Sequence, residues 1–81
     1  MSDTPIGSAE SLLPISLASP LTRAERAVVG LLLTGCPNRD IAAIRGSAES
    51  TVKRQLVSVY RKLGVDSRTR LMALMFTRRT P

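Results

Sequence analysis

The chain has 81 residues, with 12 Lys and Arg against 6 Asp and Glu, one cysteine and no histidine. These counts exclude an internal disulfide and a Cys/His zinc site, and without a histidine, a convergent carboxylate pair or a phosphate loop they disfavour an enzyme. The chain has neither an apolar run of roughly 20 residues nor a secretory signal, so we expect an intracellular protein that does not cross a membrane.

The positive charge is concentrated after residue 20. Asp3 and Glu10 are the only charged side chains before Leu21, so the remainder carries all 12 cations against 4 of the 6 anions. Ten of the cations are arginine, whose planar guanidinium suits phosphate and guanine edges. This balance favours nucleic acid as a partner, the alternative being arginine enrichment from a GC-rich genome.

Residues 1–20 are expected to form a flexible arm or linker. They are rich in Ser, Pro and Ala, and their prolines leave no space for a helix of useful length. The pentapeptide GSAES occurs here at 7–11 and again at 46–50. Only the second copy precedes a cationic helix, so we interpret the first as linker composition. A single small domain at 21–77 and a tail at 78–81 complete the predicted organisation.

Two short helices are predicted between Thr22 and Gly46. The first begins with a capping box formed by Thr22 and Glu25, and Gly35 is placed to end it. Its expected buried face consists of Val28, Val29, Leu32 and Leu33. The second follows Pro37, with Asn38 as its N-cap. Its expected buried residues are Ile41, Ala42 and Ile44.

Two longer helices are predicted in the second half of the chain. The third covers 49–63, and apolar residues recur at three- and four-residue steps on one face: Val52, Leu56, Val59, Tyr60 and Leu63. Cationic and small residues fall on its other sides: Lys53, Arg54, Val57, Ser58 and Arg61. The fourth begins at a Ser67 cap and carries five large apolar residues: Leu71, Met72, Leu74, Met75 and Phe76. This is more apolar surface than a small domain needs, which indicates a partner surface.

The second and third predicted helices form a helix-turn-helix pattern. A short helix, a glycine turn and a longer cationic helix is the arrangement that reads the DNA major groove. The groove is about 12 Å wide, so the second helix needs small or polar residues at its leading end, as in 48–51. The alternative is an ordinary amphipathic helix whose cations only face solvent.

The stretch from Leu21 to Phe76 resembles the LuxR-type, or GerE-type, DNA-binding domain of bacterial transcription factors. The matching pieces occur in order: Leu21-Thr22 with Glu25-Arg26, Asn38 with Ile41-Ala42, Thr51-Val52-Lys53, Arg61-Lys62-Leu63-Gly64-Val65, and Ser67-Arg68-Thr69. Each piece is weak alone, whereas their order and spacing together are specific. The resemblance implies an all-α four-helix bundle with a central helix-turn-helix, which binds promoter DNA as a dimer in the bacterial cytoplasm.

The resemblance also assigns roles to residues. The base-reading residues would be Lys53, Arg54 and Val57. The phosphate-binding residues would be Asn38, Ser50, Thr51, Gln55, Arg61, Ser67 and Arg68. Near Asn38 and near Ser67 and Arg68, the backbone N–H groups at the helix start would hold the phosphate. The dimer interface would consist of Leu71, Met72, Met75 and Phe76, although core packing is an alternative for at least half of them. The implied partners are double-stranded DNA and a second copy of the chain, with RNA polymerase a further candidate, and no cofactor or metal is implied.

The sequence departs from the family pattern at the start of the third helix. Ala48 occupies the position where Ser or Thr usually caps this helix, and we expect Ser47 to replace it. Two rival functions stay open: the promoter-reading region of a sigma factor, and a protein-interaction module of the same fold that has lost DNA binding. The Leu-Gly-Val piece followed by the capped Ser-Arg-Thr helix favours the LuxR type over the sigma factor.

Overall fold

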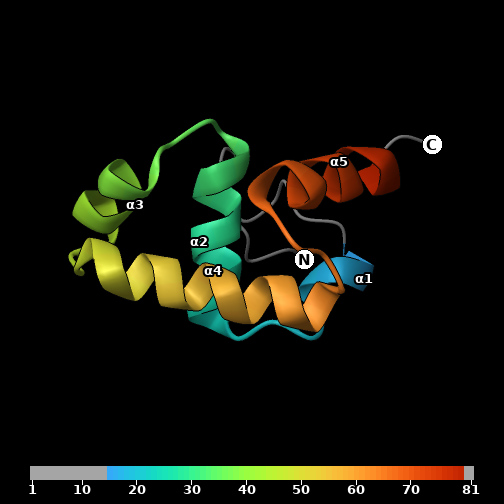
Figure 1. The fold of residues 1–81 in the computed structure, drawn as a ribbon, viewed down its shortest axis with the longest axis horizontal. Coiled ribbons are helices and arrows are strands. Elements are labelled where there is room, and N and C mark those ends of the chain that lie inside the picture. The colour runs from blue at the N-terminus through green and yellow to red at the C-terminus, as the bar shows by residue number, and fades with distance from the viewer. Residues whose placement is uncertain (1–14, 80–81) are drawn as a thin grey trace, which may run out of the picture.

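The computed structural model describes the backbone of residues 15–79 and the side chains of residues 17–77. These residues are helical and contain no strand. The helices are α1 (Ile15–Ala18), α2 (Arg23–Leu33), α3 (Asn38–Arg45), α4 (Glu49–Leu63) and α5 (Arg68–Arg79). Helix α4 crosses one end of α2, with α3 beside its N-terminal half and α5 next to its C-terminal end (Figure 1). The predicted all-α fold and its four main helices are confirmed.

The one-turn helix α1 lies inside the range that we expected to be an arm. Leu17 is buried in the same cluster as Val28 and Leu71, and the N–H of Leu21 donates to the carbonyl of Ala18 at 3.0 Å. The core therefore begins before Leu21. Residues 1–14, which include the first GSAES copy, lie outside the described residues, as do 80 and 81.

The predicted ends of the helices are mostly confirmed. The backbone N–H of Thr22 donates to Glu25 Oε1 at 2.8 Å, and the N–H of Glu25 donates to Thr22 Oγ1 at 3.1 Å, which is a complete capping box. Helix α3 ends at Gly46, whose φ of 67° lies in the left-handed region that favours glycine. The N–H of Ser47 then donates to the carbonyl of Ala42 at 2.9 Å, which closes the helix end.

Two predicted N-caps are wrong. Pro37, not Asn38, occupies the N-cap position of α3, and its carbonyl accepts from the N–H groups of Asp40 and Ile41 at 2.9 and 3.0 Å. The N-cap of α4 is Ala48, without any side-chain cap, because the backbone of Ser47 instead completes the end of α3. Helix α4 thus begins without the roughly 1 kcal/mol that a side-chain cap supplies.

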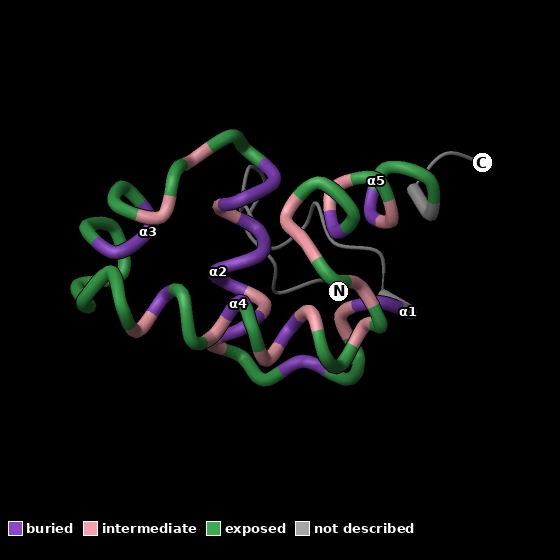
Figure 2. The backbone as a smooth tube through the Cα atoms, in the orientation of Figure 1, coloured by how far each residue is buried: buried purple, intermediate pink, exposed green. Residues whose placement is uncertain are grey.

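The core joins α2 to one face of each neighbouring helix (Figure 2). Its fully buried large side chains are Leu32, Ile41, Leu71, Met75, Val28, Val29, Val52 and Val59. Tyr60 and Leu63 are half-buried against this cluster. None of the described helices combines the length and apolar character that a bilayer crossing requires.

The prediction that Ile44 is buried is wrong, because this residue is 61% exposed. Helix α3 buries only Ile41 and Ala42. At about 100° of rotation per residue, Ile44 lies roughly 110° from the middle of the arc that these two residues define. Helices α2 and α4, which pack against α3, therefore cover only a narrow stripe of it, and Ile44 lies outside that stripe.

Candidate nucleic-acid interface

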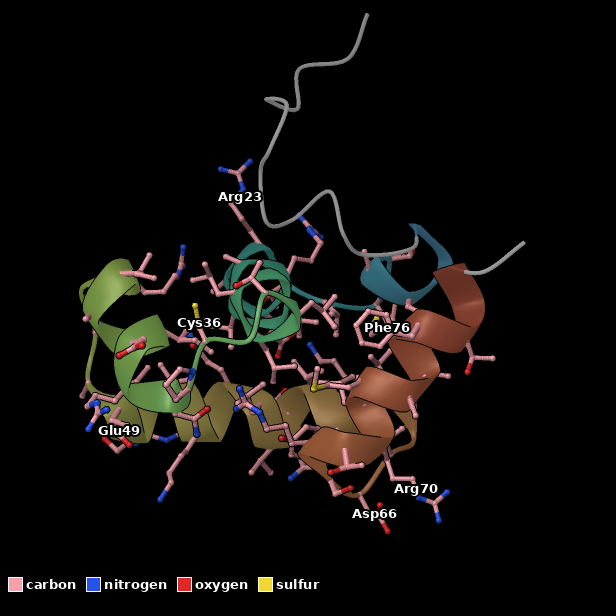
Figure 3. The ribbon with its side chains drawn as sticks, turned by 90° about the horizontal axis from the view of Figure 1, so that it is seen from above. Arg23, Cys36, Glu49, Asp66, Arg70 and Phe76 are labelled. Atoms are coloured by element: carbon pink, nitrogen blue, oxygen red, sulfur yellow. The ribbon has the colours of Figure 1, made fainter. Side chains whose placement is uncertain are left out.

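Helices α3 and α4 pack against each other and are joined by the turn at 46–48. Helix α4 also contacts α2, so one side of α4 is held by the core along most of its length. Glu49 marks the leading end of α4 in Figure 3, and Asp66 lies just beyond its other end. The arrangement presents the remaining side of a 15-residue helix to solvent.

The exposed side of α4, which we call its outer face, carries five residues at steps of one, three or four positions. They are Ser50, Lys53, Arg54, Val57 and Arg61. All five are exposed, whereas Val52, Leu56 and Val59 on the opposite side are buried. The predicted base-reading residues therefore share one face with two of the predicted phosphate-binding residues. The helical period brings them together, and packing against α2 and α3 leaves them free.

The cations of the outer face have no partner among the described side chains. Among the described side chains, the ion pairs join Arg39 to Asp40 and Lys62 to Glu25. Lys53, Arg54 and Arg61 are therefore available to an external anion. Glu49 is the one acidic residue of α4, and its position in the first turn is favourable for the helix dipole.

The other predicted phosphate-binding residues lie at the margins of this face or away from it. Thr51 and Gln55 are half-buried on α4. Ser67 caps α5, as predicted, because its Oγ accepts from the N–H of Arg70 at 3.2 Å. Arg70 and Asp66 project from the molecule where α4 gives way to α5 (Figure 3).

Arg68 and Asn38 are brought together by the fold, and they bind each other. Arg68 Nη1 donates to Asn38 Oδ1 at 2.8 Å, and Nη2 donates to the carbonyl of Cys36 at 2.5 Å. The guanidinium therefore links the start of α5 to the loop before α3. Burial raises the pKa of the nearby Tyr60 hydroxyl, and the charge of Arg68 acts in the opposite direction. The side chains of Asn38 and Arg68 thus have structural partners, whereas the phosphate contacts expected at these two positions use the backbone N–H groups at the starts of α3 and α5.

The family model described as bacterial regulatory proteins, luxR family, matches residues 19–75. The chain belongs to the LuxR family. No solved structure matched it. Membership of this family makes the domain a DNA-binding regulator of the helix-turn-helix type. The exposed cations on the outer face of α4 agree with this general role.

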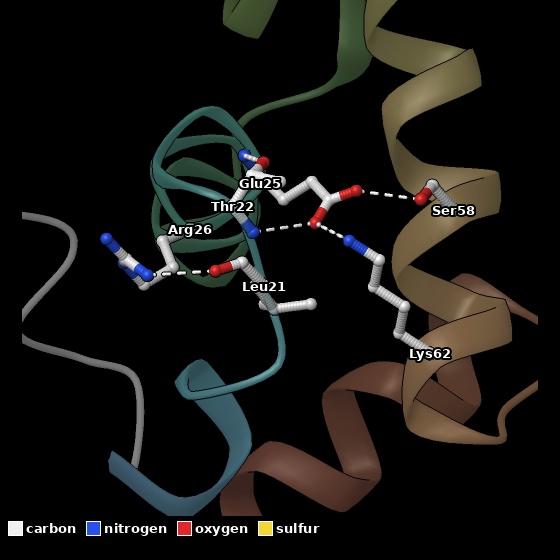
Figure 4. A network of polar contacts seen from close by, with 6 residues as sticks. All are labelled: Leu21, Thr22, Glu25, Arg26, Ser58 and Lys62. Carbon is white, nitrogen blue, oxygen red and sulfur yellow. Dashed lines mark hydrogen bonds and ion pairs between the residues drawn. The ribbon is translucent and has the colours of Figure 1, made fainter.

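The LuxR-family domain contains a buried polar network that the sequence did not predict (Figure 4). Glu25 is only 6% exposed, yet its Oε2 accepts from Ser58 Oγ at 2.7 Å and its Oε1 accepts from Lys62 Nζ at 2.7 Å. We expected Glu25 only as half of the capping box. Ser58 and Lys62 are four residues apart on α4, so they reach the same side of that helix. From the sequence, the four-residue spacing indicates only that Ser58 and Lys62 share one side of the helix. It does not identify Glu25, 37 positions before Lys62, as their partner.

The same contacts determine the charge state of Glu25. Burial alone would raise the pKa of its carboxyl group. Hydrogen bonds from Lys62, the Thr22 N–H and Ser58, together with the positive charge of Lys62, outweigh burial and lower the pKa from 4.5 to about 2. The carboxylate is therefore ionised at neutral pH, and its two oxygens are satisfied by the capping box and by α4.

The fold changes the predicted dimer surface of the LuxR-family domain. Leu71 and Met75 are completely buried in the core, so they are not available to a second copy. Met72 is half-buried, and Phe76 is 47% exposed. Of the four residues that the resemblance assigned to the interface, Met72 and Phe76 keep accessible surface. The four-residue spacing of Leu71 and Met75 identifies the stripe of α5 that faces the core.

Proposed function

We propose that this LuxR-family domain is a sequence-specific transcriptional regulator that inserts α4 into the major groove and binds promoter DNA as a dimer. The observation that carries this proposal is the outer face of α4, where three cations without an ion pair among the described side chains surround one apolar side chain opposite the buried face. The buried side of α4 is fixed by the core, so the helix can enter a groove as a rigid element, and the cations of its outer face attract phosphates.

The proposal gives the outer-face residues different tasks. Arg54 offers two parallel donors to the O6 and N7 of guanine, which is the commonest specific contact to a base. Lys53 reaches base edges beside it. Arg61 and Ser50 bind phosphates nearer the two ends of α4, and such contacts set the register of the helix without reading sequence. Thr51 and Gln55 are half-buried, which suits contacts to the flanking backbone rather than to the centre of the groove.

The dimer is proposed to form through the accessible part of α5. Met72 and Phe76 are four residues apart on that helix, and both retain exposed surface. In a two-fold dimer, both half-sites of an operator would face identical α4 helices at a fixed spacing of about one helical turn of DNA or a multiple of it. Binding at promoters in the bacterial cytoplasm would make RNA polymerase a further partner.

Selection of bound duplexes from a random pool tests the proposal directly. We expect a recovered motif with two symmetric half-sites, and an affinity that falls steeply as salt rises because bound phosphates release counterions. Recovery of no motif, together with no salt-sensitive shift of any duplex at low ionic strength, would contradict the proposal. That result would favour an interaction module that has lost DNA binding.

A further inference from the structure

Val57 is the only apolar member of the outer face of α4. Its side chain is 52% exposed, and it belongs with Ile44 and Phe76 to the large apolar side chains that the described surface leaves open. Lys53 and Arg54 lie one turn before it on the same face, and Arg61 lies one turn after it. An exposed valine among unpaired cations gains nothing from the core, because Val52, Leu56 and Val59 face the other way.

The chemistry of valine limits what Val57 can bind in a groove. Its side chain has no hydrogen-bond donor or acceptor, so it can bind neither a phosphate nor the polar edge of a base. In the major groove, the only apolar group on a base edge is the C5 methyl of thymine. A β-branched side chain in a helix also has one strongly preferred rotamer, so contact costs it little further conformational freedom.

The surroundings of Val57 argue against an apolar protein partner as its occupant. Burying the outer face against another protein would also bury Lys53, Arg54 and Arg61 without partners, which is unfavourable for charged groups. DNA offers a partner to both kinds of side chain, because phosphates pair with the cations and a methyl group contacts the valine. The mixture of charges and one apolar side chain is therefore complementary to a thymine-containing groove.

We propose that Val57 reads the C5 methyl group of one thymine in each half-site, so that the protein distinguishes a methylated pyrimidine from an unmethylated one. This inference rests on the proposed function, because it requires α4 to lie in the major groove. A consequence is that 5-methylcytosine, which carries the same methyl group, is accepted at that position better than cytosine.

The test uses the purified 81-residue chain and the duplex operator recovered from the random pool. Each thymine of a half-site is replaced in turn by deoxyuridine, which removes only the methyl group. We expect one replacement to weaken binding by about fourfold, the effect of losing contact with one buried methyl group. Val57→Ala should bind the thymine and deoxyuridine operators equally well. An operator with 5-methylcytosine at this position should bind the unsubstituted chain more tightly than an operator with cytosine there.

Ile44→Ala is the matched control, because Ile44 is an exposed apolar residue that lies on α3 rather than on the outer face. It should keep the full sensitivity to deoxyuridine. An operator without any methyl-sensitive thymine would overturn the inference and leave the proposed function intact, and so would a Val57→Ala variant that keeps the sensitivity. Failure to recover any operator would instead overturn the proposed function. Circular dichroism of each variant confirms that altered binding does not reflect unfolding.

Discussion

Lys62 Nζ lies 2.7 Å from Glu25 Oε1, and this ion pair ties the last turn of α4 to the first turn of α2 (Figure 4). The carboxylate side chain is 7% exposed and the lysine side chain 34% exposed, so one end of the pair is dry and the other reaches water. Ser58 donates to the second carboxylate oxygen from the preceding turn of α4. The proposed DNA-reading helix is therefore anchored to the scaffold at the end opposite to the α3 turn.

Replacing Glu25 by Gln should lower the free energy of unfolding by about 1 to 3 kcal/mol. The amide keeps the shape of the side chain but removes the charge that Lys62 and Ser58 bind, and breaking a buried charged network is costly. Urea unfolding followed by circular dichroism measures the change. Glu49→Gln is the control, because Glu49 is exposed on α4 and should change stability by less than about 0.5 kcal/mol. Equal effects of the two substitutions would argue against the network.

Stability should fall when the pH drops below 4.5. Glu25 has a lower pKa in the folded chain, about 2, than its ordinary 4.5, so the folded state favours the ionised form. Its stabilisation is complete above pH 4.5 and is lost progressively toward pH 2. Each pKa unit corresponds to about 1.4 kcal/mol, so the loss is on the order of 3 kcal/mol. Urea midpoints between pH 7 and pH 2.5 measure it, and Glu25→Gln should flatten this part of the profile.

Arg68→Ala should destabilise the fold by about 1 to 2 kcal/mol, because it removes two charge-assisted hydrogen bonds that connect α5 to Asn38 and to the loop at Cys36. Arg70→Ala is the matched control, since Arg70 is exposed near the same end of α5. Thermal unfolding compares the two variants. If Arg68→Ala left stability unchanged but lowered the salt dependence of DNA binding, the Arg68 side chain would be a phosphate contact rather than a link within the fold.

Arg54→Ala and Arg61→Ala should affect DNA binding in different ways. Loss of the Arg54 fork removes about 1 to 3 kcal/mol of discrimination, so preference should relax at one or two base positions. Loss of Arg61 should weaken all duplexes alike and reduce the salt slope by about 1. Repeated selections and salt titrations measure both quantities. Uniform effects from both variants would remove the assignment of Arg54 as a base reader.

Met72→Asp should weaken binding to an operator with two half-sites by more than about tenfold, while binding to a single half-site stays nearly unchanged. A carboxylate in an apolar dimer contact loses its hydration without gaining a partner. Ala73→Asp is the control, because Ala73 is exposed on α5 outside the proposed contact. Sedimentation of the protein–DNA complexes reports the stoichiometry. An unchanged ratio between the two operators would contradict dimerisation through α5.

Much of the fold could be predicted because its determinants are local. The capping box at Thr22 and the end of α3 at Gly46 depend on residues within one helical turn. The buried face of α4 follows from the three- and four-residue spacing of Val52, Leu56 and Val59. The failures at Asn38 and Ser47 are also local, because the hydrogen bonds are made by backbone groups that a search for cap-forming side chains overlooks. The carbonyl of Pro37 accepts at the start of α3, and the N–H of Ser47 donates to the end of α3.

The sequence by itself determined the four main helices, the positive charge and the membership of the LuxR family. Only the tertiary structure decided which of the cations are free. Lys62 and Arg68 are held by partners 37 and 30 positions away, whereas Lys53, Arg54 and Arg61 face solvent without an ion pair among the described side chains. The packing of α5 likewise buries Leu71 and Met75 and leaves Phe76 accessible. The physical reason is that helical periodicity places residues around one helix, while the docking of helices decides which of these positions meet another part of the chain.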